Sequence, residues 1–135
     1  MIEMAKYLLD TDICIAMFKN WGGVREKIIE VGRRNCCVSD ITLAELYYGA
    51  AKSERPEHID DVAFIVSHFE VLSIHSSLAR YGQTKWMLQK QGCPLDDFDL
   101  LIGTSAVEQN LIMVTHNQRH YARIPNIQLE DWIVG

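Results

Sequence analysis

The sequence has few of the residues that divide or anchor a chain. Proline occurs 3 times and glycine 8 times in 135 residues, and neither gathers into a linker. No apolar run approaches the roughly 18 residues of a membrane span, and Met1–Leu9 lacks the pattern of a signal peptide. Since about 100–200 residues make one domain, we expect a single domain over residues 1–135 that stays in the cytoplasm, where it is made.

Metal-binding cysteine pairs are also missing. The four cysteines include no Cys-x-x-Cys pair, and Cys36 and Cys37 are neighbours inside an apolar run. His116 and His120 have the spacing of a helical metal site, but no Glu follows the first histidine and the stretch around them is polar. A disulfide scaffold and a zinc site are therefore not expected, and buried thiols are.

The chain has no excess of positive charge. Its 13 Lys and Arg residues stand against 18 Asp and Glu residues, which gives a net charge of −5. This balance argues against a protein that coats nucleic acid through bulk charge. It does not exclude an enzyme that cuts nucleic acid at a local acidic site holding a metal ion.

Short apolar runs alternate with stretches of helical period. The expected strands are Tyr7–Leu9, Cys36–Val38, Val71–Ile74 and Leu111–Val114, with a weaker fifth around Ile127–Leu129. Runs without polar alternation are typical of parallel strands that are covered on both faces. The alternation predicts an α/β fold with a parallel sheet of four to five strands and helices on both faces. In such sheets the ligand site lies beyond the carboxyl ends of the strands.

Acidic residues lie where that site is expected. Asp10 directly follows the first strand, so it either faces the crevice or caps the next helix. Glu45 follows the second strand on a helix, between apolar residues, where it points to solvent or towards the strand ends. Asp99 opens the fourth helix and looks half-buried, whereas Asp96 and Asp97 in the same turn are explained by the helix dipole.

These acids carry more weight together than singly. Two carboxylates about 5 Å apart repel by roughly 3 kcal/mol at an effective dielectric of about 20, so three converging acids need a cation. Oxygen ligands from separate elements suit Mg²⁺ or Mn²⁺, which also bind phosphate oxygens. No P-loop or Gly-x-Gly-x-x-Gly motif offers another way to bind an anion.

Polar residues follow the fourth strand. Asn117 can bind a metal-bound water or simply form a turn, and Thr115 can hold a phosphate or a water. Arg119, His120 and Arg123 place further polar and cationic groups near the same edge. They would contact the phosphates of a polynucleotide or, alternatively, form a solvated surface.

Four segments together resemble a known family. They are Leu8–Ile13 (LLDTDI), Ile41–Gly49 (ITLAELYYG), Pro94–Ile102 (PLDDFDLLI) and Val114–Arg119 (VTHNQR). In order and spacing they resemble the motifs of PIN-domain ribonucleases of the VapC toxin type. The resemblance extends from Lys6 to Trp132, and four motifs in register are far more specific than any one.

The resemblance implies a single PIN domain with a Rossmann-like α/β/α sandwich. It implies a Mg²⁺-dependent endoribonuclease toxin, with Mn²⁺ as an alternative ion, that hydrolyses RNA by metal-activated water and leaves 5′-phosphate and 3′-hydroxyl ends. Transfer RNA is the expected target. The implied partners are a VapB-type antitoxin, a second copy of the chain in a homodimer, and operator DNA reached only through the antitoxin. An apolar groove lined from Ile13–Phe18 and Tyr47–Ala50 is expected to receive the antitoxin.

The resemblance also assigns roles to individual residues. Asp10 and Asp99 would bind the metal directly, and Glu45 would bind it through water or activate water. The supporting residues would be Thr11, Asp96 and Thr115. Asn117 stands where the family often has Asp and brings no charge, and Asp12 stands where many members have Asn and adds an acid or another cap.

Two other functions compete with this interpretation. A haloacid-dehalogenase-type phosphatase would use Asp10 as nucleophile and Asp12 as acid, with Lys85 and the Asp96–Asp97 pair completing its site. That class expects its last acidic pair after a buried strand, and Leu88–Pro94 does not resemble one. Alternatively, the chain is a catalytically inactive module that only binds an antitoxin.

Overall fold

A single five-stranded sheet organises the computed structural model, which describes residues 6–135. The strands are β1 (Tyr7–Leu9), β2 (Cys36–Ser39), β3 (Glu70–Leu72), β4 (Ile112–Val114) and β5 (Gln128–Glu130). All neighbours are parallel, in the order β3-β2-β1-β4-β5. The strand nearest the start of the chain therefore lies at the centre, between β2 and β4. Residues 1–5 of the expected domain lie outside the described residues.

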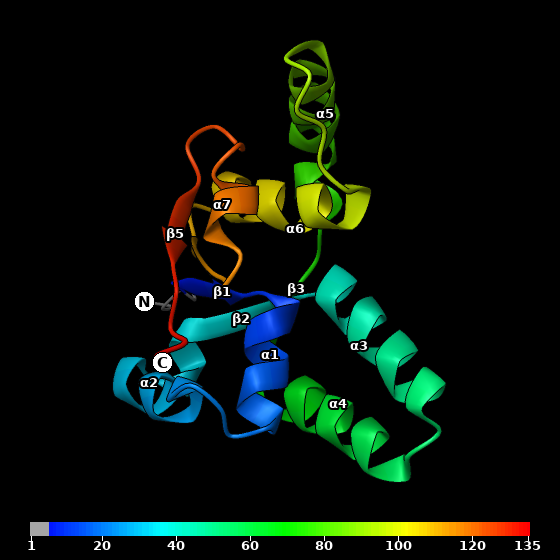
Figure 1. The fold of residues 1–135 in the computed structure, drawn as a ribbon, viewed down its shortest axis with the longest axis vertical. Coiled ribbons are helices and arrows are strands. Elements are labelled where there is room, and N and C mark those ends of the chain that lie inside the picture. Colours follow the sequence, from blue (N-terminus) through cyan, green and yellow to red (C-terminus); the bar gives the residue numbers. More distant parts are fainter. Residues whose placement is uncertain (1–5) are drawn as a thin grey trace.

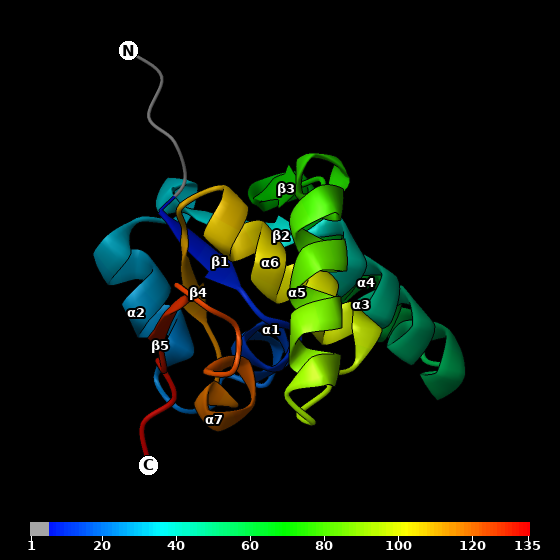
Figure 2. The same cartoon turned by 90° about the horizontal axis from the view of Figure 1, so that it is seen from above.

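Helices cover both faces of this sheet (Figures 1 and 2). They are α1 (Thr11–Phe18), α2 (Val24–Val31), α3 (Asp40–Ser53), α4 (Pro56–His68), α5 (Leu78–Lys90), α6 (Asp97–Glu108) and α7 (Gln118–Tyr121), with the short 3-10 turns η1 (Arg33–Asn35) and η2 (His75–Ser77). Residues of α1 to α4 fill one core cluster, and residues of α5 to α7 fill the other. The predicted α/β/α sandwich is confirmed.

The apolar runs form strands that are buried on both sides. Side chains alternate along a strand, so Leu9 and Cys36 enter the first core cluster while Leu8 and Cys37 enter the second. Burial raises the pKa of the Cys36 and Cys37 thiols to about 12. All four cysteines are free, and three of them are buried, as the sequence predicts.

Some elements differ from the prediction. The strand expected at Val71–Ile74 is present as β3, but its predicted bounds and burial are wrong: β3 begins at Glu70 and ends at Leu72, on the sheet edge, where Glu70 and Val71 are exposed. The predicted fifth strand, Ile127–Leu129, begins and ends one residue later as β5. Helices α2 and α7 were not expected from the pattern, because both are short and mostly exposed.

Three helices begin at the carboxyl edge of the sheet. Asp10 follows β1 and caps α1, Ser39 ends β2 and caps α3, and Asp96 caps α6. In each cap a side-chain oxygen accepts a hydrogen bond from a backbone N–H of the first turn. These caps bring the starts of α1, α3 and α6 to the edge where a ligand site is expected. Within residues 6–135 no helix is long and apolar enough to cross a membrane.

Candidate active site

Asp10 lies at the centre of the carboxyl edge and is 6% exposed. Its carboxylate accepts hydrogen bonds from the Thr11 amide at 2.8 Å, the Thr115 hydroxyl at 2.9 Å and the Tyr121 hydroxyl at 3.3 Å. Its pKa is raised to about 7: burial is the largest cause and the charges of Asp12 and Asp99 add to it, while the Thr11 and Thr115 hydrogen bonds act in the opposite direction. Asp10 thus both caps α1 and presents a destabilised charge at the site.

Asp99, in the first turn of α6, shares a partner with Asp10. Its Oδ1 accepts a hydrogen bond from the Tyr121 hydroxyl at 3.0 Å, and its Oδ2 lies 2.8 Å from Nε2 of His120. One buried hydroxyl therefore stands between two carboxylates from distant parts of the chain. The nearby negative charge of Asp99 raises the pKa of Asp10.

Glu45 reaches the same place from α3. Its Oε1 accepts a hydrogen bond of 2.7 Å from the Thr11 hydroxyl, which itself lies 3.3 Å from the Thr42 hydroxyl. Partial burial raises the pKa of Glu45, as do the nearby charges of Asp99 and Asp96, while the Thr11 hydrogen bond lowers it. Glu45 therefore points towards the strand ends and not into open solvent.

The remaining predicted residues are distributed around this centre. Thr115 is buried, donates to Asp10, and accepts a hydrogen bond from the Asn117 amide at 3.0 Å. Asp96 is exposed and caps α6 by accepting from the Phe98 amide. Asn117, Arg119 and Arg123 are exposed, and Arg123 donates to the Pro94 carbonyl at 3.3 Å. The structure thus brings Thr11 and Thr115 into contact with the acids and leaves these other residues at the rim.

Asp12 forms a second polar group beside Asp10. Its Oδ2 accepts a hydrogen bond from the His116 amide at 3.0 Å, and burial is the main cause that raises its pKa. The His116 ring lies 2.8 Å from a carboxylate oxygen of Asp131 and meets the Trp21 ring edge-on. Asp12 therefore adds an acid near Asp10 and ties α1 to the loop after β4.

Tyr121 is the site residue that sequence reasoning missed. It is 1% exposed, and burial together with Asp10 and Asp99 raises the pKa of its phenol. Its ring packs on Gly103 of α6, where an added Cβ would lie 3.2 Å from the ring and collide with the Ile124 side chain. A glycine inside a helix costs about 0.5–1 kcal/mol, so Gly103 was the sequence signal that α6 receives a close neighbour.

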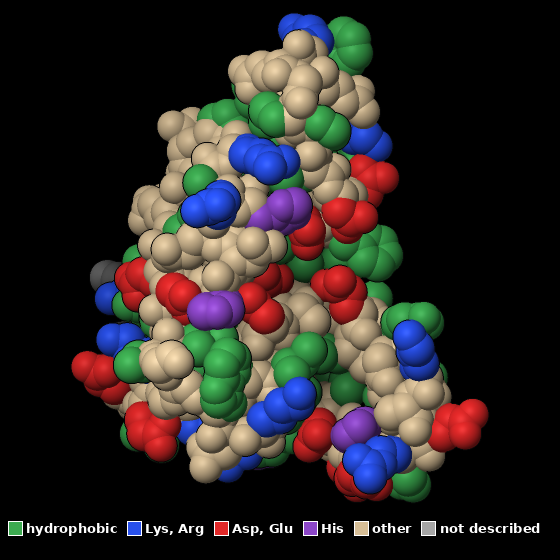
Figure 3. Space-filling view, viewed as in Figure 1, with side chains coloured by type: hydrophobic (Ala, Val, Ile, Leu, Met, Phe, Trp, Pro, Cys, Tyr) green, Lys and Arg blue, Asp and Glu red, His purple; other side chains and the backbone are tan. Residues whose placement is uncertain are grey.

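The donor set fits a hard divalent cation. Asp10, Asp99 and Glu45 supply only oxygen atoms, and the pKa values of Asp10 and Glu45 are raised, which a cation would reverse. Within residues 6–135 no three His, Cys, Asp or Glu side chains close around a common point. Instead the carboxylates stand slightly apart: the Tyr121 hydroxyl links Asp10 to Asp99, and Thr11 donates its amide to Asp10 and its hydroxyl to Glu45. In the space-filling view of Figure 3, acidic side chains gather across the middle of the face that is shown, with histidines beside them.

Comparison with known proteins gives this fold and site a family. Residues 7–126 match the model of the PIN domain, and the chain belongs to the PIN-domain family. Nucleases of that family generally need a divalent metal.

Relatives that match nearly the full chain are named VapC. The chain is 39% identical over 132 residues to the tRNA(fMet)-specific endonuclease VapC of Shigella flexneri, covering 96% of this chain and 99% of that one. It is similar to a chain of the crystal structure of DNA-bound VapBC from Salmonella typhimurium, with a TM-score of 0.87, 37% identity, and 96% and 99% of the two chains covered. VapBC2 from Rickettsia felis, bound to a DNA fragment from its promoter, gives a TM-score of 0.85 at 30% identity with the same coverage.

The family match overturns the phosphatase alternative. That class expects Asp96 and Asp97 after a buried strand, but the pair follows the loop after α5 and begins α6. Lys85 and Asp97 form an exposed ion pair of 2.7 Å away from Asp10. Asp97 therefore has a partner outside the acidic centre and no part in it.

Proposed function

We propose that this chain is a Mg²⁺-dependent endoribonuclease toxin of the VapC type. The observation that carries the proposal is the pair of carboxylates, Asp10 and Asp99, joined by one buried hydroxyl at the carboxyl edge of a PIN-domain sheet. Glu45 lies close enough to Asp99 for that charge to raise its pKa, and it accepts a hydrogen bond from Thr11, the residue after Asp10. The VapC names of relatives over nearly the full chain support the activity.

The proposed roles follow from the contacts. Asp10 and Asp99 would hold Mg²⁺ (or Mn²⁺) directly, and Glu45 would hold it through a water. When bound, the ion supplies positive charge that orients water and offsets charge on the phosphodiester. Thr115 fixes Asp10 by its hydroxyl, Thr11 fixes Glu45, and Asp96 adds negative charge near Glu45.

Exposed residues at the rim would meet the substrate. Asn117 would hydrogen-bond a water or the RNA, and Arg119 and Arg123 would contact RNA phosphates. We propose transfer RNA as the substrate, because the Shigella flexneri and Salmonella typhimurium relatives are named tRNA(fMet)-specific endonucleases. The proposed place of action is the cytoplasm, where that RNA works.

The activity is tested by a pair of substitutions in one helix turn. Asp99→Asn should reduce Mg²⁺-dependent cleavage of initiator tRNA by about a hundredfold or more, because it removes a charged oxygen from the metal site. Asp97→Asn is the matched control: it removes a carboxylate two positions away whose partners are Lys85 and Tyr81, and it should leave cleavage unchanged. The measurement is the initial rate on a gel, with the RNA ends identified.

The same assay separates this proposal from its alternatives. Fragments should carry 5′-phosphate and 3′-hydroxyl ends, and a 2′,3′-cyclic phosphate would contradict attack by water. Equal cleavage by the Asp99→Asn and Asp97→Asn variants, or cleavage that a chelator does not stop, would refute the metal site. A wild-type chain that binds antitoxin but never cuts RNA would support the inactive module.

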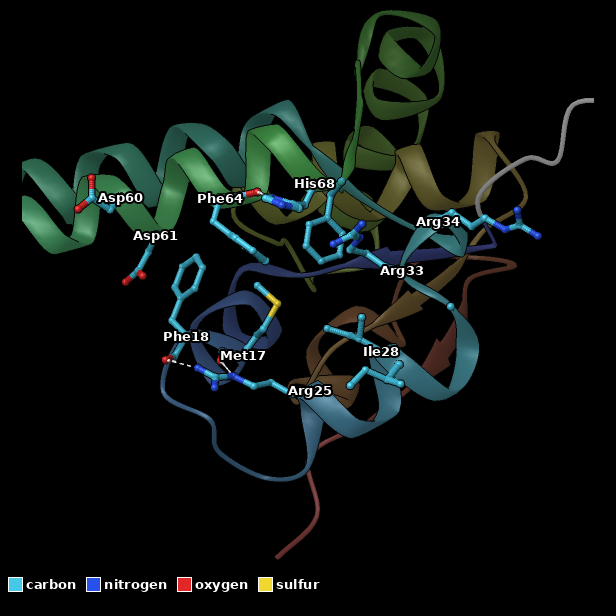
Figure 4. Close-up of a pocket in the computed structure, with 13 residues that line it drawn as sticks. Met17, Phe18, Arg25, Ile28, Arg33, Arg34, Asp60, Asp61, Phe64 and His68 are labelled. Atoms are coloured by element: carbon cyan, nitrogen blue, oxygen red, sulfur yellow. Dashed lines mark hydrogen bonds between the residues drawn. The ribbon is translucent and has the colours of Figure 1, made fainter.

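The antitoxin is proposed to bind a groove between α1, α2 and α4. The cavity has a volume of about 910 Å³, and its apolar lining includes Met17, Phe18, Ile28 and Phe64. Figure 4 shows these side chains around the cavity, with Asp60 on α4 at one end and Arg34 at the other. An amphipathic helix with charges of both signs fits such a groove. The expected segment Ile13–Phe18 thus contributes to the groove, whereas Tyr47–Ala50 does not line it.

Truncating the groove should weaken the complex and spare the enzyme. Phe64→Ala removes an aromatic ring that lines the cavity and packs on His68 and Phe69. We expect antitoxin binding to weaken about tenfold to a hundredfold, with RNA cleavage unchanged. Val66→Ala, an exposed apolar truncation on the same helix outside the groove, should change neither. The measurement is calorimetric titration with the cognate antitoxin, and equal affinities for both variants would show that the groove is misplaced.

Two further associations follow from the family. We propose that the chain forms homodimers and that it reaches operator DNA only through the antitoxin. DNA is bound in the VapBC complexes of Salmonella typhimurium and Rickettsia felis. The net charge of −5 on this chain also disfavours direct binding to DNA.

A further inference from the structure

The hydroxyl of Tyr121 occupies an unusual place between two acids. Its oxygen lies 3.0 Å from Oδ1 of Asp99 and 3.3 Å from Oδ1 of Asp10. A phenol carries one proton, so the two carboxylates share a single donor. That donor comes from α7, whereas the acids come from the end of β1 and the start of α6.

Each of these carboxylates is held at both oxygens. On Asp10, the Thr115 hydroxyl holds Oδ2 while Tyr121 holds Oδ1. On Asp99, the His120 ring lies 2.8 Å from Oδ2 while Tyr121 holds Oδ1. A carboxyl group fixed at both oxygens cannot rotate. Oδ1 of Asp10 also accepts from the Thr11 amide, so both of its acceptor directions are used. Each oxygen accepts from about two directions, so free lone pairs remain on Oδ2 of Asp10 and on the oxygens of Asp99. The free lone pairs therefore point in directions that Tyr121 helps to set.

The ring that carries this hydroxyl is itself fixed. Tyr121 is 1% exposed and belongs to the second core cluster. It packs on Gly103, where even one added carbon atom would lie 3.2 Å from the ring. Moving the hydroxyl away from the acids would therefore require repacking α7 on α6. The hydroxyl is a permanent part of the site.

We propose that Tyr121 is a positioning residue for a divalent cation, holding Asp10 and Asp99 in the orientation in which they bind the ion. The inference rests on the proposed function, which assigns the ion to these two carboxylates. The hydrogen bonds of Tyr121 persist when the ion is bound, because the ring cannot leave. Groups that orient metal ligands in this way typically change metal affinity by about 10- to 100-fold.

Direct binding of Mn²⁺ to the full chain tests this proposal without any RNA. Tyr121→Phe keeps the ring and removes only the hydroxyl, so it should weaken Mn²⁺ binding at least about tenfold. Free Mn²⁺ is measured by its electron paramagnetic resonance signal during a titration. A Tyr121→Phe variant that binds Mn²⁺ as tightly as the wild type, or more tightly, overturns the proposal.

The chain offers a matched control. The Tyr81 hydroxyl also donates to an aspartate, Asp97, at 2.7 Å, but that pair lies outside the acidic centre. Tyr81→Phe should leave Mn²⁺ affinity unchanged, and Asp10→Asn should abolish binding. Wild type that binds no Mn²⁺ refutes the proposed function and this inference together. If the wild type binds Mn²⁺, the Asp10→Asn variant does not, and the Tyr121→Phe variant binds as tightly as the wild type, only this inference is refuted.

A second measurement needs no variant of Tyr121. Of the tyrosines in residues 6–135, Tyr121 is the buried one, so its hydroxyl proton should exchange slowly with water and give its own nuclear magnetic resonance signal. Saturating Mg²⁺ should shift this signal and leave it in slow exchange. Loss of the signal on adding Mg²⁺ would show that the hydroxyl lets go of the carboxylates, which contradicts a positioning role.

Discussion

Asp10→Asn is expected to abolish RNA cleavage and at the same time to stabilise the metal-free protein at pH 8. The cleavage rate should fall by more than about a hundredfold, because a ligand charge is lost. The free energy of unfolding should rise by about 1–3 kcal/mol, because a buried charge becomes a neutral amide. Its NH₂ group can donate to the Thr115 hydroxyl, which can then donate to Asp12, 3.5 Å away.

Both effects are measurable on one preparation. Urea denaturation in the presence of a chelator gives the stability, and cleavage of initiator tRNA with Mg²⁺ gives the activity. Asp97→Asn serves as the control and should retain activity without any gain in stability, because its carboxylate is exposed and paired with Lys85. An Asp10→Asn protein less stable than the wild type at pH 8 would contradict the view that Asp10 is kept for function at a cost in stability.

The metal-free wild type is expected to lose stability as the pH rises from about 4 to about 7. The folded protein raises the pKa of Asp10 from 3.8 to about 7, so in this window the folded state binds more protons than the unfolded state. The stabilising contribution of Asp10 is fully present below the pKa that it has in the unfolded chain. It is lost as the pH rises through the higher pKa that Asp10 has in the folded protein. A shift of this size corresponds to at most about 4 kcal/mol.

The difference between wild type and Asp10→Asn isolates this effect. Asp12 and Glu45 shift in the same direction, and Asp97 shifts in the opposite one, but all three are common to both proteins. Urea denaturation at several pH values should show a wild-type disadvantage that grows from pH 4 to pH 7. Mg²⁺ should reduce that disadvantage, since it favours the ionised carboxylate. If the difference in the free energy of unfolding between the two proteins did not change with pH, the pKa of Asp10 would be the same in the folded and unfolded states, which contradicts the prediction.

The central strands β1, β2 and β4 could be predicted from the sequence because their local residue patterns favour one structure. The runs at β1, β2 and β4 are apolar without alternation, and only a strand covered on both faces explains them. The edge strand β3 was misjudged because Val71, Leu72 and Ile74 are apolar in sequence whatever covers them. An edge position depends on what packs beside the strand, which the local sequence does not contain.

The candidate site was predictable in its acids and not in the groups that hold them. Asp10, Glu45 and Asp99 follow strands or begin helices, and parallel topology brings such positions to one edge. Tyr121 lies in a four-residue helix after a polar stretch, with no period to show which side is buried. Its role depends on the packing of α7 against Gly103, a contact between separate helices. His120 was expected near this edge, but its contact with Asp99 was not.

The hydrogen bond between Asp10 and Tyr121 joins residues 111 positions apart in the chain. During synthesis on a ribosome, Asp10 is made well before Asp99, Thr115 and Tyr121. A nascent chain therefore lacks the assembled centre until Tyr121 has been translated, and a product that stops before Thr115 never acquires it. We expect the nuclease to remain inert towards the translation machinery that is still making it.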